Sequence, residues 1–179
     1  MIQHKIGDLF NNDADVIVHQ VNCKGVMGSG VAKQVKEFFP CTFAAYKDMC
    51  QTRASHNALS SLLGKALVRV EELEGREVWV ANLFAQLDYG RDGKCYTDYT
   101  AFREALKSMT AQLLLFSVLN ERDPKIAIPY RIGCDRGGGD WDTVRQIIED
   151  ELGDLDVTLY ELPSNAPGGF NGKKDCQHG

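Results

Sequence analysis

The sequence predicts a single-domain α/β fold, a three-layer α/β/α sandwich with a mixed six-stranded sheet. Strand-like and helix-like segments alternate along the chain, which is typical of sheets built with crossover helices. Two strand-like runs, at residues 16–21 and 126–129, are apolar on both faces, as in a sheet covered on both sides. Glycine is enriched, with 17 of 179 residues, and much of the excess collects at two strand-to-helix junctions. Ligands bind at such junctions in parallel α/β folds.

The six strands are expected from short apolar or alternating runs. They are Ile2–Ile6, Asp15–Val21, Lys65–Glu71, Glu77–Leu83, Lys125–Pro129 and Asp156–Leu162. Gly75 predicts a hairpin between the third and fourth strands. Apolar residues at helical spacing predict three helices, and the segment after Pro40 predicts a fourth. These helices are placed near residues 29–38, 42–49, 99–113 and 141–152.

Composition and chain organisation indicate a soluble protein of one domain. Apolar residues make up 44% and charged residues 25%, and no apolar run approaches the roughly 20 residues that span a bilayer. The domain is expected over residues 1–162, followed by a polar tail, residues 163–179, that we expect to be mobile. The N-terminus lacks the basic start and apolar stretch of a secretory signal, so we expect a cytoplasmic protein.

Charge and cysteine usage exclude several classes of partner. The net charge of −5 argues against direct binding of nucleic acid by phosphate neutralisation, but not against a small anionic ligand. The six cysteines form no C-x-x-C pair and the four histidines stand apart, which argues against a zinc cluster. We therefore expect no metal, no cofactor and no membrane partner.

The first glycine-rich junction covers residues 21–33. The positive end of a following helix and free backbone N–H groups make such a turn a natural anion site. It is not a Walker A loop, because Val31 and Ala32 stand where lysine and serine or threonine are required. The order G-x-x-G-x-G also differs from the dinucleotide-binding G-x-G-x-x-G. The alternative is a tight turn with a purely structural role.

The second junction, residues 129–141, again follows a buried strand and precedes a helix, for which Asp140 is a plausible N-cap. A cysteine before glycines invites comparison with the Cys-x5-Arg loop of cysteine phosphatases. Here Asp140 would fill the arginine position and would repel a phosphate, so Cys134 is interpreted as an apolar wall. Two such loops can hold the two ends of an elongated, multiply charged ligand such as a diphosphate flanked by sugars.

Four segments in sequence resemble the macrodomain family, whose members bind ADP-ribose. They are Gly7-Asp8-Leu9, the strand and turn over 15–22, GVMGSGVA, and IAIPYRIGC with GGGDW. The resemblance covers residues 1–162. Within the family, VNCKGVMGSGVA and NLFAQ followed by YGRDG most resemble the branch of ADP-ribose-1″-phosphate phosphatases.

The resemblance implies roles for individual residues. Asp8 would accept a hydrogen bond from the adenine amino group, and Asn22 would lie beside the distal ribose. Tyr160 would pack near the adenine, or be an ordinary core residue. The implied ligand-binding residues are Asp8, Leu9, Gln20, Asn22, Met27, Gly28, Ser29, Gly30, Val31, Ile132, Gly133, Cys134, Asp135, Arg136, Gly137, Gly138 and Tyr160.

Catalytic candidates are His19, Asn22, Asp135 and Asp140. The phosphatase branch is similar in having a histidine at the position of His19, and histidine can accept a proton from water near pH 7. The alternative is a buried histidine satisfied by a backbone carbonyl. Asp135 and Asp140 could orient a water molecule or the histidine, or serve as a helix cap or a surface charge.

The leading functional hypothesis is hydrolysis of the terminal phosphate of ADP-ribose-1″-phosphate without a metal. The alternatives are a hydrolase that removes ADP-ribose from modified macromolecules or deacetylates O-acetyl-ADP-ribose, and a reader that binds ADP-ribose without catalysis. Macrodomains that release ADP-ribose from glutamate or thymidine use a lysine after the strand written VWVANLFAQ, where this chain has Ala85 and Gln86. The Asn-Ala-Ala-Asn pattern of deacetylase-like members is also absent. The expected partners are ADP-ribose, its 1″-phosphate and ADP-ribosylated macromolecules.

Overall fold

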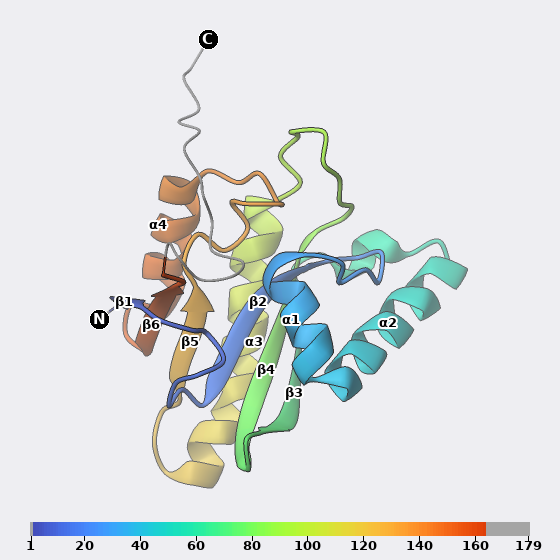
Figure 1. The fold of residues 1–179 in the computed structure, drawn as a ribbon. Helices are drawn as coiled ribbons and strands as arrows, with labels where there is room; N and C mark the ends of the chain where they lie inside the picture. The colour runs from blue at the N-terminus through green and yellow to red at the C-terminus, as the bar shows by residue number, and fades with distance from the viewer. Residues whose placement is uncertain (1, 164–179) are drawn as a thin grey trace.

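The computed structural model describes residues 2–163, so the predicted tail after Pro163 lies outside the described residues. Its centre is one six-stranded sheet in the order β1-β6-β5-β2-β4-β3 (Figure 1). The strands are β1 (Ile2–Ile6), β2 (Val16–Asn22), β3 (Ala66–Leu73), β4 (Arg76–Gln86), β5 (Lys125–Pro129) and β6 (Asp156–Glu161). Every neighbouring pair is parallel except β3 and β4, which form the predicted hairpin, so the sheet is mixed as expected.

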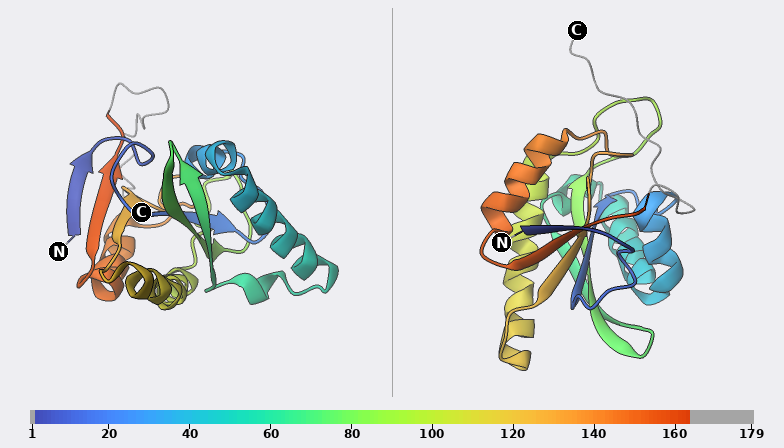
Figure 2. Two further views of the ribbon diagram at one scale, coloured as in Figure 1. Left: turned by 90° about the horizontal axis from the view of Figure 1, so that it is seen from below. Right: turned by 60° about the vertical axis from the view of Figure 1, so that its left-hand side comes forward.

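Helices cover the two faces of the sheet and make the predicted three layers (Figure 2). The helices are α1 (Gly30–Phe38), α2 (Pro40–Ser55), the short 3₁₀ helix η1 (Leu59–Leu62), α3 (Tyr99–Asn120) and α4 (Trp141–Leu152). One apolar core lies between the sheet and α1, α2 and η1, and a second lies between the sheet and α3 and α4. The alternation of buried residues in β2, with Val16 and Val18 in one core and Ile17 and Val21 in the other, explains why this strand is apolar on both faces.

Several elements are longer than the sequence patterns predict. Strand β4 continues past Leu83 to Gln86, because Phe84 and Ala85 are fully buried in opposite cores. Helix α3 continues past Leu113 to Asn120, although much of its last part is exposed. Helix α2 extends the expected helix at both ends. None of the helices within residues 2–163 is long and apolar enough to cross a membrane.

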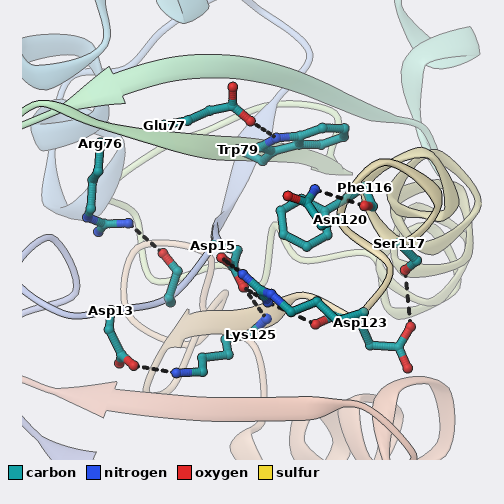
Figure 3. A network of polar contacts seen from close by, with 12 residues as sticks. Asp13, Asp15, Arg76, Glu77, Trp79, Phe116, Ser117, Asn120, Asp123 and Lys125 are labelled. Carbon is teal, nitrogen blue, oxygen red and sulfur yellow. Dashed lines mark hydrogen bonds and ion pairs between the residues drawn. The ribbon is translucent and has the colours of Figure 1, made fainter.

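A polar network fastens the end of the sheet at which β2 begins (Figure 3). The Asp15 carboxylate accepts hydrogen bonds from both terminal nitrogens of Arg122 at 2.7 Å and from the Lys125 N–H at 2.8 Å. Partial burial opposes ionisation of Asp15, but the hydrogen bonds from Arg122 and Lys125 lower its pKa below the usual value. Arg76 donates to the Ala14 carbonyl beside this network at 2.7 Å. This end of the sheet is therefore tied together, and the loops gather at the other end.

Candidate functional site

The loops that follow β2, β4 and β5 come together where these parallel strands end, toward the top of Figure 1. We call residues 23–29 the first glycine loop, residues 87–98 the connecting loop and residues 130–140 the second glycine loop. Strand β1 is parallel to β6, and β6 is parallel to β5. The segment after Ile6 therefore leaves the sheet at the same end as these loops, the end at which the parallel strands finish. The segments that carry most of the predicted site residues thus meet at the carboxyl ends of the strands, where ligands bind in this class of fold.

Asn22 shapes the first glycine loop from the last position of β2. Its Oδ1 accepts hydrogen bonds from the N–H of Lys24 at 2.9 Å and from the Tyr46 hydroxyl at 3.0 Å. Its Nδ2 donates to the Val26 carbonyl at 2.7 Å. The Asn22 side chain is therefore engaged in holding the loop.

Helix α1 starts without a side-chain cap at the end of this loop. The N-cap residue Ser29 has extended backbone angles, and its hydroxyl makes no capping hydrogen bond. The first helical bond runs from the Lys33 N–H to the Ser29 carbonyl at 3.3 Å. Within the described part of the chain, no acceptor takes the N–H groups of Gly30, Val31 or Ala32. Unpaired donors of this kind, at the positive end of a helix dipole, are able to bind an anion.

The space in front of these donors is open. A Cβ at Gly28 would meet only Val26 Cγ1 at 3.7 Å, and one at Gly30 would meet nothing within 4 Å. Gly30 has φ +56°, which favours glycine, whereas Gly28 lies outside the left-handed region. The lack of a side chain at Gly28 therefore serves neither packing nor backbone geometry within the protein. Met27 points the other way: its side chain is buried in the core under α1 and α2, so only its backbone can face a ligand.

In the second glycine loop, glycine is required because there is no space for a side chain. A Cβ at Gly137 would collide with the Gly133 carbonyl and with Thr97 Oγ1, and a Cβ at Gly138 would lie 2.6 Å from the Lys94 carbonyl. The Gly137 carbonyl accepts hydrogen bonds from the N–H groups of Tyr96 and Thr97 at 2.7 and 3.0 Å. These glycines allow the loop to pack directly on the connecting loop, a partner that sequence reasoning missed.

Three side chains join the strands to both loops below this contact. Gln20 on β2 donates from Nε2 to Gln86 Oε1 at 2.9 Å and to Thr97 Oγ1 at 2.8 Å. Thr97 donates in turn to the Gly133 carbonyl at 2.7 Å. Gln20 thus acts as a brace beneath the second glycine loop, rather than as an exposed group.

The second glycine loop itself presents charged residues and backbone donors to solvent. Arg131 adopts φ +59°, a strained conformation for a residue with a side chain and one that collects at functional sites. Asp135 and Arg136 are exposed, and within residues 2–163 neither their side chains nor their N–H groups make a hydrogen bond. Burial raises the pKa of the Cys134 thiol to about 12, so it is neutral at pH 7 and cannot act as a thiolate nucleophile. Its environment agrees with a wall, since Cys134 packs against the core on the α3 side.

His19 lies within the sheet rather than at the loop surface. Its Nε2 is 2.7 Å from Asn82 Oδ1, and Asn82 Nδ2 donates to the Leu67 carbonyl at 2.9 Å. Because the amide of Asn82 is oriented by Leu67, its oxygen faces the ring and His19 Nε2 is the donor. The residue is 1% exposed, and burial lowers its pKa to about 4, so the imidazole is neutral at pH 7. Its buried Nδ1 has no hydrogen-bond partner among the described residues.

Asp140 is the N-cap of α4, as predicted. Its carboxylate accepts hydrogen bonds from the Thr143 N–H at 2.9 Å and from the Thr143 hydroxyl at 2.7 Å. Its own N–H donates to the Tyr99 hydroxyl at 2.8 Å. Within residues 2–163, no group of three or more histidine, cysteine or acidic side chains could hold a metal ion.

Asp8 and Tyr160 lie at neighbouring strand ends. Asp8 is exposed, and one of its oxygens accepts a hydrogen bond from the Phe10 N–H at 2.9 Å, while Leu9 is buried in the core. The half-buried Tyr160 ring would lie 3.5 Å from a Cβ at Gly7. An exposed carboxylate therefore follows directly on a glycine that packs beside an aromatic ring.

Comparisons with known proteins agree on one fold. No family model matches the chain. It is 30% identical over 166 residues to the DNA ADP-ribosyl glycohydrolase of Mycobacterium tuberculosis, covering 89% of this chain but 42% of that protein. It is 28% identical over 182 residues to the ADP-ribose 1″-phosphate phosphatase of Aspergillus fumigatus, covering 86% of this chain and 90% of that one. Among solved structures, the macrodomain of Mycobacterium tuberculosis DarG superposes with a TM-score of 0.67 at 27% identity, covering 89% of this chain and 97% of that chain. The chain thus spans less than half the length of the glycohydrolases that it matches.

Proposed function

Because the chain belongs to the macrodomain family, we propose that it binds ADP-ribose across its two glycine loops and hydrolyses the terminal phosphate of ADP-ribose-1″-phosphate. The observation that carries the proposal is the open space at Gly28 and Gly30 in front of the uncapped start of α1. Three unpaired N–H groups there suit the oxygens of a diphosphate, and the glycine backbone lets that group approach. The similarity to a phosphatase over 90% of that enzyme's length supports the choice of substrate.

The other expected contacts with the ligand come from residues at the same end of the sheet. The exposed carboxylate of Asp8 would accept a hydrogen bond from the adenine amino group, and Tyr160 would pack beside the base. The unengaged N–H groups of Asp135 and Arg136 would bind the phosphate that is released. Backbone donors fixed in place before the reaction stabilise developing negative charge without reorganisation, which is the main electrostatic contribution in such sites.

Asp135 is the acidic candidate best placed to orient the attacking water. Its carboxylate is exposed and makes no hydrogen bond within residues 2–163, whereas the Asp140 carboxylate caps α4. His19 is enclosed and bonded to Asn82, so we assign it a structural role between β2 and β4 and not direct contact with water. Asn22 would act through the shape of the first glycine loop.

A second candidate activity is the removal of ADP-ribose from modified DNA, which the similarity to DNA ADP-ribosyl glycohydrolases favours. Against it stands the residue that ends β4. The lysine expected there from macrodomains that release ADP-ribose from glutamate or thymidine is replaced by Gln86, whose amide bonds to Gln20 and to the Asp88 carbonyl. Lys94 is exposed on the connecting loop and forms an ion pair with Asp92 at 2.9 Å. An amine nucleophile is therefore not offered by Gln86 or by Lys94 as it is placed.

The test compares three substrates on the same purified chain. We expect phosphate release from ADP-ribose-1″-phosphate, and little release of ADP-ribose from ADP-ribosylated DNA or protein. Calorimetry should show ADP-ribose binding in the micromolar range, about −8 kcal/mol, with AMP weaker because it does not reach the second glycine loop. Release of ADP-ribose from DNA without phosphate release would favour the second activity. Binding without any turnover would indicate a reader.

A further inference from the structure

The second half of α3 and the edge strand β3 expose a set of large apolar side chains away from the candidate site. The set consists of Val70, Leu114, Leu115, Val118 and Leu119, each between 51% and 75% exposed. We call these five residues the edge patch. Large apolar patches on a soluble protein mark contact surfaces more often than chance exposure.

Val70 and one flank of the last part of α3 lie on the same side of the sheet. Val70 pairs across the hairpin with Trp79, so the two side chains share the α3 face of the sheet, and the Trp79 ring packs edge-on against Phe116 at 5.5 Å. On α3, Leu119 lies three residues after the buried Phe116 and is therefore its neighbour on the helix surface, whereas Leu114 and Val118 lie on the opposite side of the helix. Ser108 and Gln112 of α3 bond to the backbone of Ala66 in β3, and Leu115 and Leu119 continue that flank of the helix at helical spacing.

The outer edge of β3 has unused backbone groups beside this patch. Strand β3 ends the sheet order, and its neighbour on one side is β4. The N–H and carbonyl of Ala66 point outward, because they bond to Ser108 and Gln112 of α3. Backbone direction alternates along a strand, so the groups of Val68, Val70 and Glu72 also point outward. An edge strand with free pairing groups is a template for another strand.

The charges on β3 identify the strand that fits. If two copies of β3 pair antiparallel about Val70, Val70 faces its own copy, and Arg69 of each chain faces Glu71 of the other. Arg69 and Glu71 lie on the α2 face, where Glu71 also accepts a hydrogen bond from Thr42 of α2 at 2.6 Å. Arg69 is exposed and has no ion pair among the described residues. Opposite charges directly across a strand pair stabilise it, and here both pairs arise from one two-fold axis.

We propose that the edge patch is a homodimer interface, in which β3 of one chain pairs antiparallel with β3 of a second copy, centred on Val70. The pairing continues the six-stranded sheet into the second copy and brings the apolar ends of the two α3 helices toward one another. The candidate site of each copy lies at the carboxyl ends of its strands, away from the two-fold axis at Val70, and remains accessible. This inference does not rest on the proposed function.

The primary test is the mass of the full chain in solution by sedimentation equilibrium between about 1 and 100 μM, the range in which weak to moderate dimers form. We expect a concentration-dependent shift to twice the monomer mass. Leu119→Glu, which places a charge in the patch at an exposed position, should weaken dimerisation at least about 10-fold while the monomer stays folded. Leu87→Glu changes another exposed leucine, outside the patch, and should leave association unchanged.

A mixing experiment tests the register. Arg69→Glu alone brings two glutamates together, and Glu71→Arg alone brings two arginines together, so each variant should associate more weakly than the wild type. An equimolar mixture of the two restores both opposite-charge pairs, and we expect heterodimers in native mass spectrometry. A wild-type chain that stays monomeric, or a dimer that survives Leu119→Glu, would overturn the interface. A mixture that associates no better than either variant would overturn the β3 pairing.

Discussion

His19 and Asn82 face each other on adjacent strands of the sheet, with Nε2 of the histidine 2.7 Å from Oδ1 of the asparagine. Asn82 is in turn held by the Leu67 carbonyl, so the pair joins β2, β4 and β3 under the core that α1 and α2 cover. A buried, neutral imidazole in such a pair stabilises the fold in a pH-dependent manner.

The pH dependence has a definite sign. The pKa of His19 is lowered by burial from 6.5 to about 4, so between these values the unfolded chain binds more protons than the folded one. The free energy of unfolding therefore has its full value above pH 6.5 and falls as the pH drops toward 4, by about 3 kcal/mol from this group. Urea unfolding at several pH values measures this.

The control for that measurement is His19→Ala. It should lower stability at pH 7 by about 1–3 kcal/mol, since Asn82 loses its partner, and should flatten the decline between pH 6.5 and 4. Phosphate release per folded molecule should change little. A fall in turnover of about 100-fold or more with stability intact would instead show that His19 acts on the water.

Gly28→Val should separate binding from folding. The position has room for a side chain and no positive φ, so the free energy of unfolding should stay within about 0.5 kcal/mol of wild type. The added methyl groups occupy the space in front of α1, so the Kd for ADP-ribose should rise at least about 10-fold, with a smaller rise for Gly28→Ala. Titration calorimetry measures the Kd of each variant. An unchanged Kd would mean that the ligand does not contact the first glycine loop at Gly28.

Gly137→Ala should have the opposite profile. The new Cβ would collide with the Gly133 carbonyl and Thr97 Oγ1, which are fixed in the contact between the second glycine loop and the connecting loop. We expect a loss of about 1–3 kcal/mol in thermal or urea unfolding, the usual cost of overpacking. Stability equal to that of the wild type would show that this contact yields easily.

Asp135 and Asp140 should differ in what their removal costs. Asp135→Asn should reduce phosphate release by about 100-fold with little effect on stability, if this carboxylate orients the water. Asp140→Ala removes the cap of α4 and should cost about 1 kcal/mol of stability while turnover per folded molecule persists. If turnover survives in Asp135→Asn, the role assigned to Asp135 is wrong.

Asp8→Asn tests the adenine end. The asparagine oxygen can still accept the Phe10 N–H, so the local turn is kept and the negative charge is lost. Loss of a charge-assisted hydrogen bond should weaken the binding of ADP-ribose by about 1–3 kcal/mol. The binding of AMP should weaken by the same factor, since AMP carries the same base. If neither affinity changes in titration calorimetry, the adenine binds elsewhere.

The elements with strong local signals were predictable from the sequence. The apolar run of β2, the hairpin at Gly75 and the cap at Asp140 all express themselves within a few neighbouring residues, and the structure confirms them. The alternating pattern predicts the end of β4 at Leu83; the strand continues to Gln86 because Phe84 and Ala85 are buried in the two cores and Gln86 finds a partner in Gln20 on another strand.

At the candidate site, the features that the sequence did not predict also depend on residues that are distant in the chain. The connecting loop has no periodicity, so nothing in its sequence indicated that Tyr96 and Thr97 would hold Gly137. Met27 was expected at the ligand, but a loop gives no alternation from which to infer that its side chain enters the core. The partner of His19 required the register of β2 against β4, which places Asn82 opposite it.

The missing cap of α1 implies that its ligand would complete the helix. Amide hydrogens at the start of an uncapped helix exchange with solvent through fraying, at little free-energy cost. An anion held by the Gly30, Val31 and Ala32 amides would slow their exchange and, by mass action, raise the unfolding temperature of the whole chain. Ligand binding would then stabilise the first turn of α1. The hydrogen-exchange rates of its amides would report whether the site is occupied, even in a variant that cannot turn over substrate.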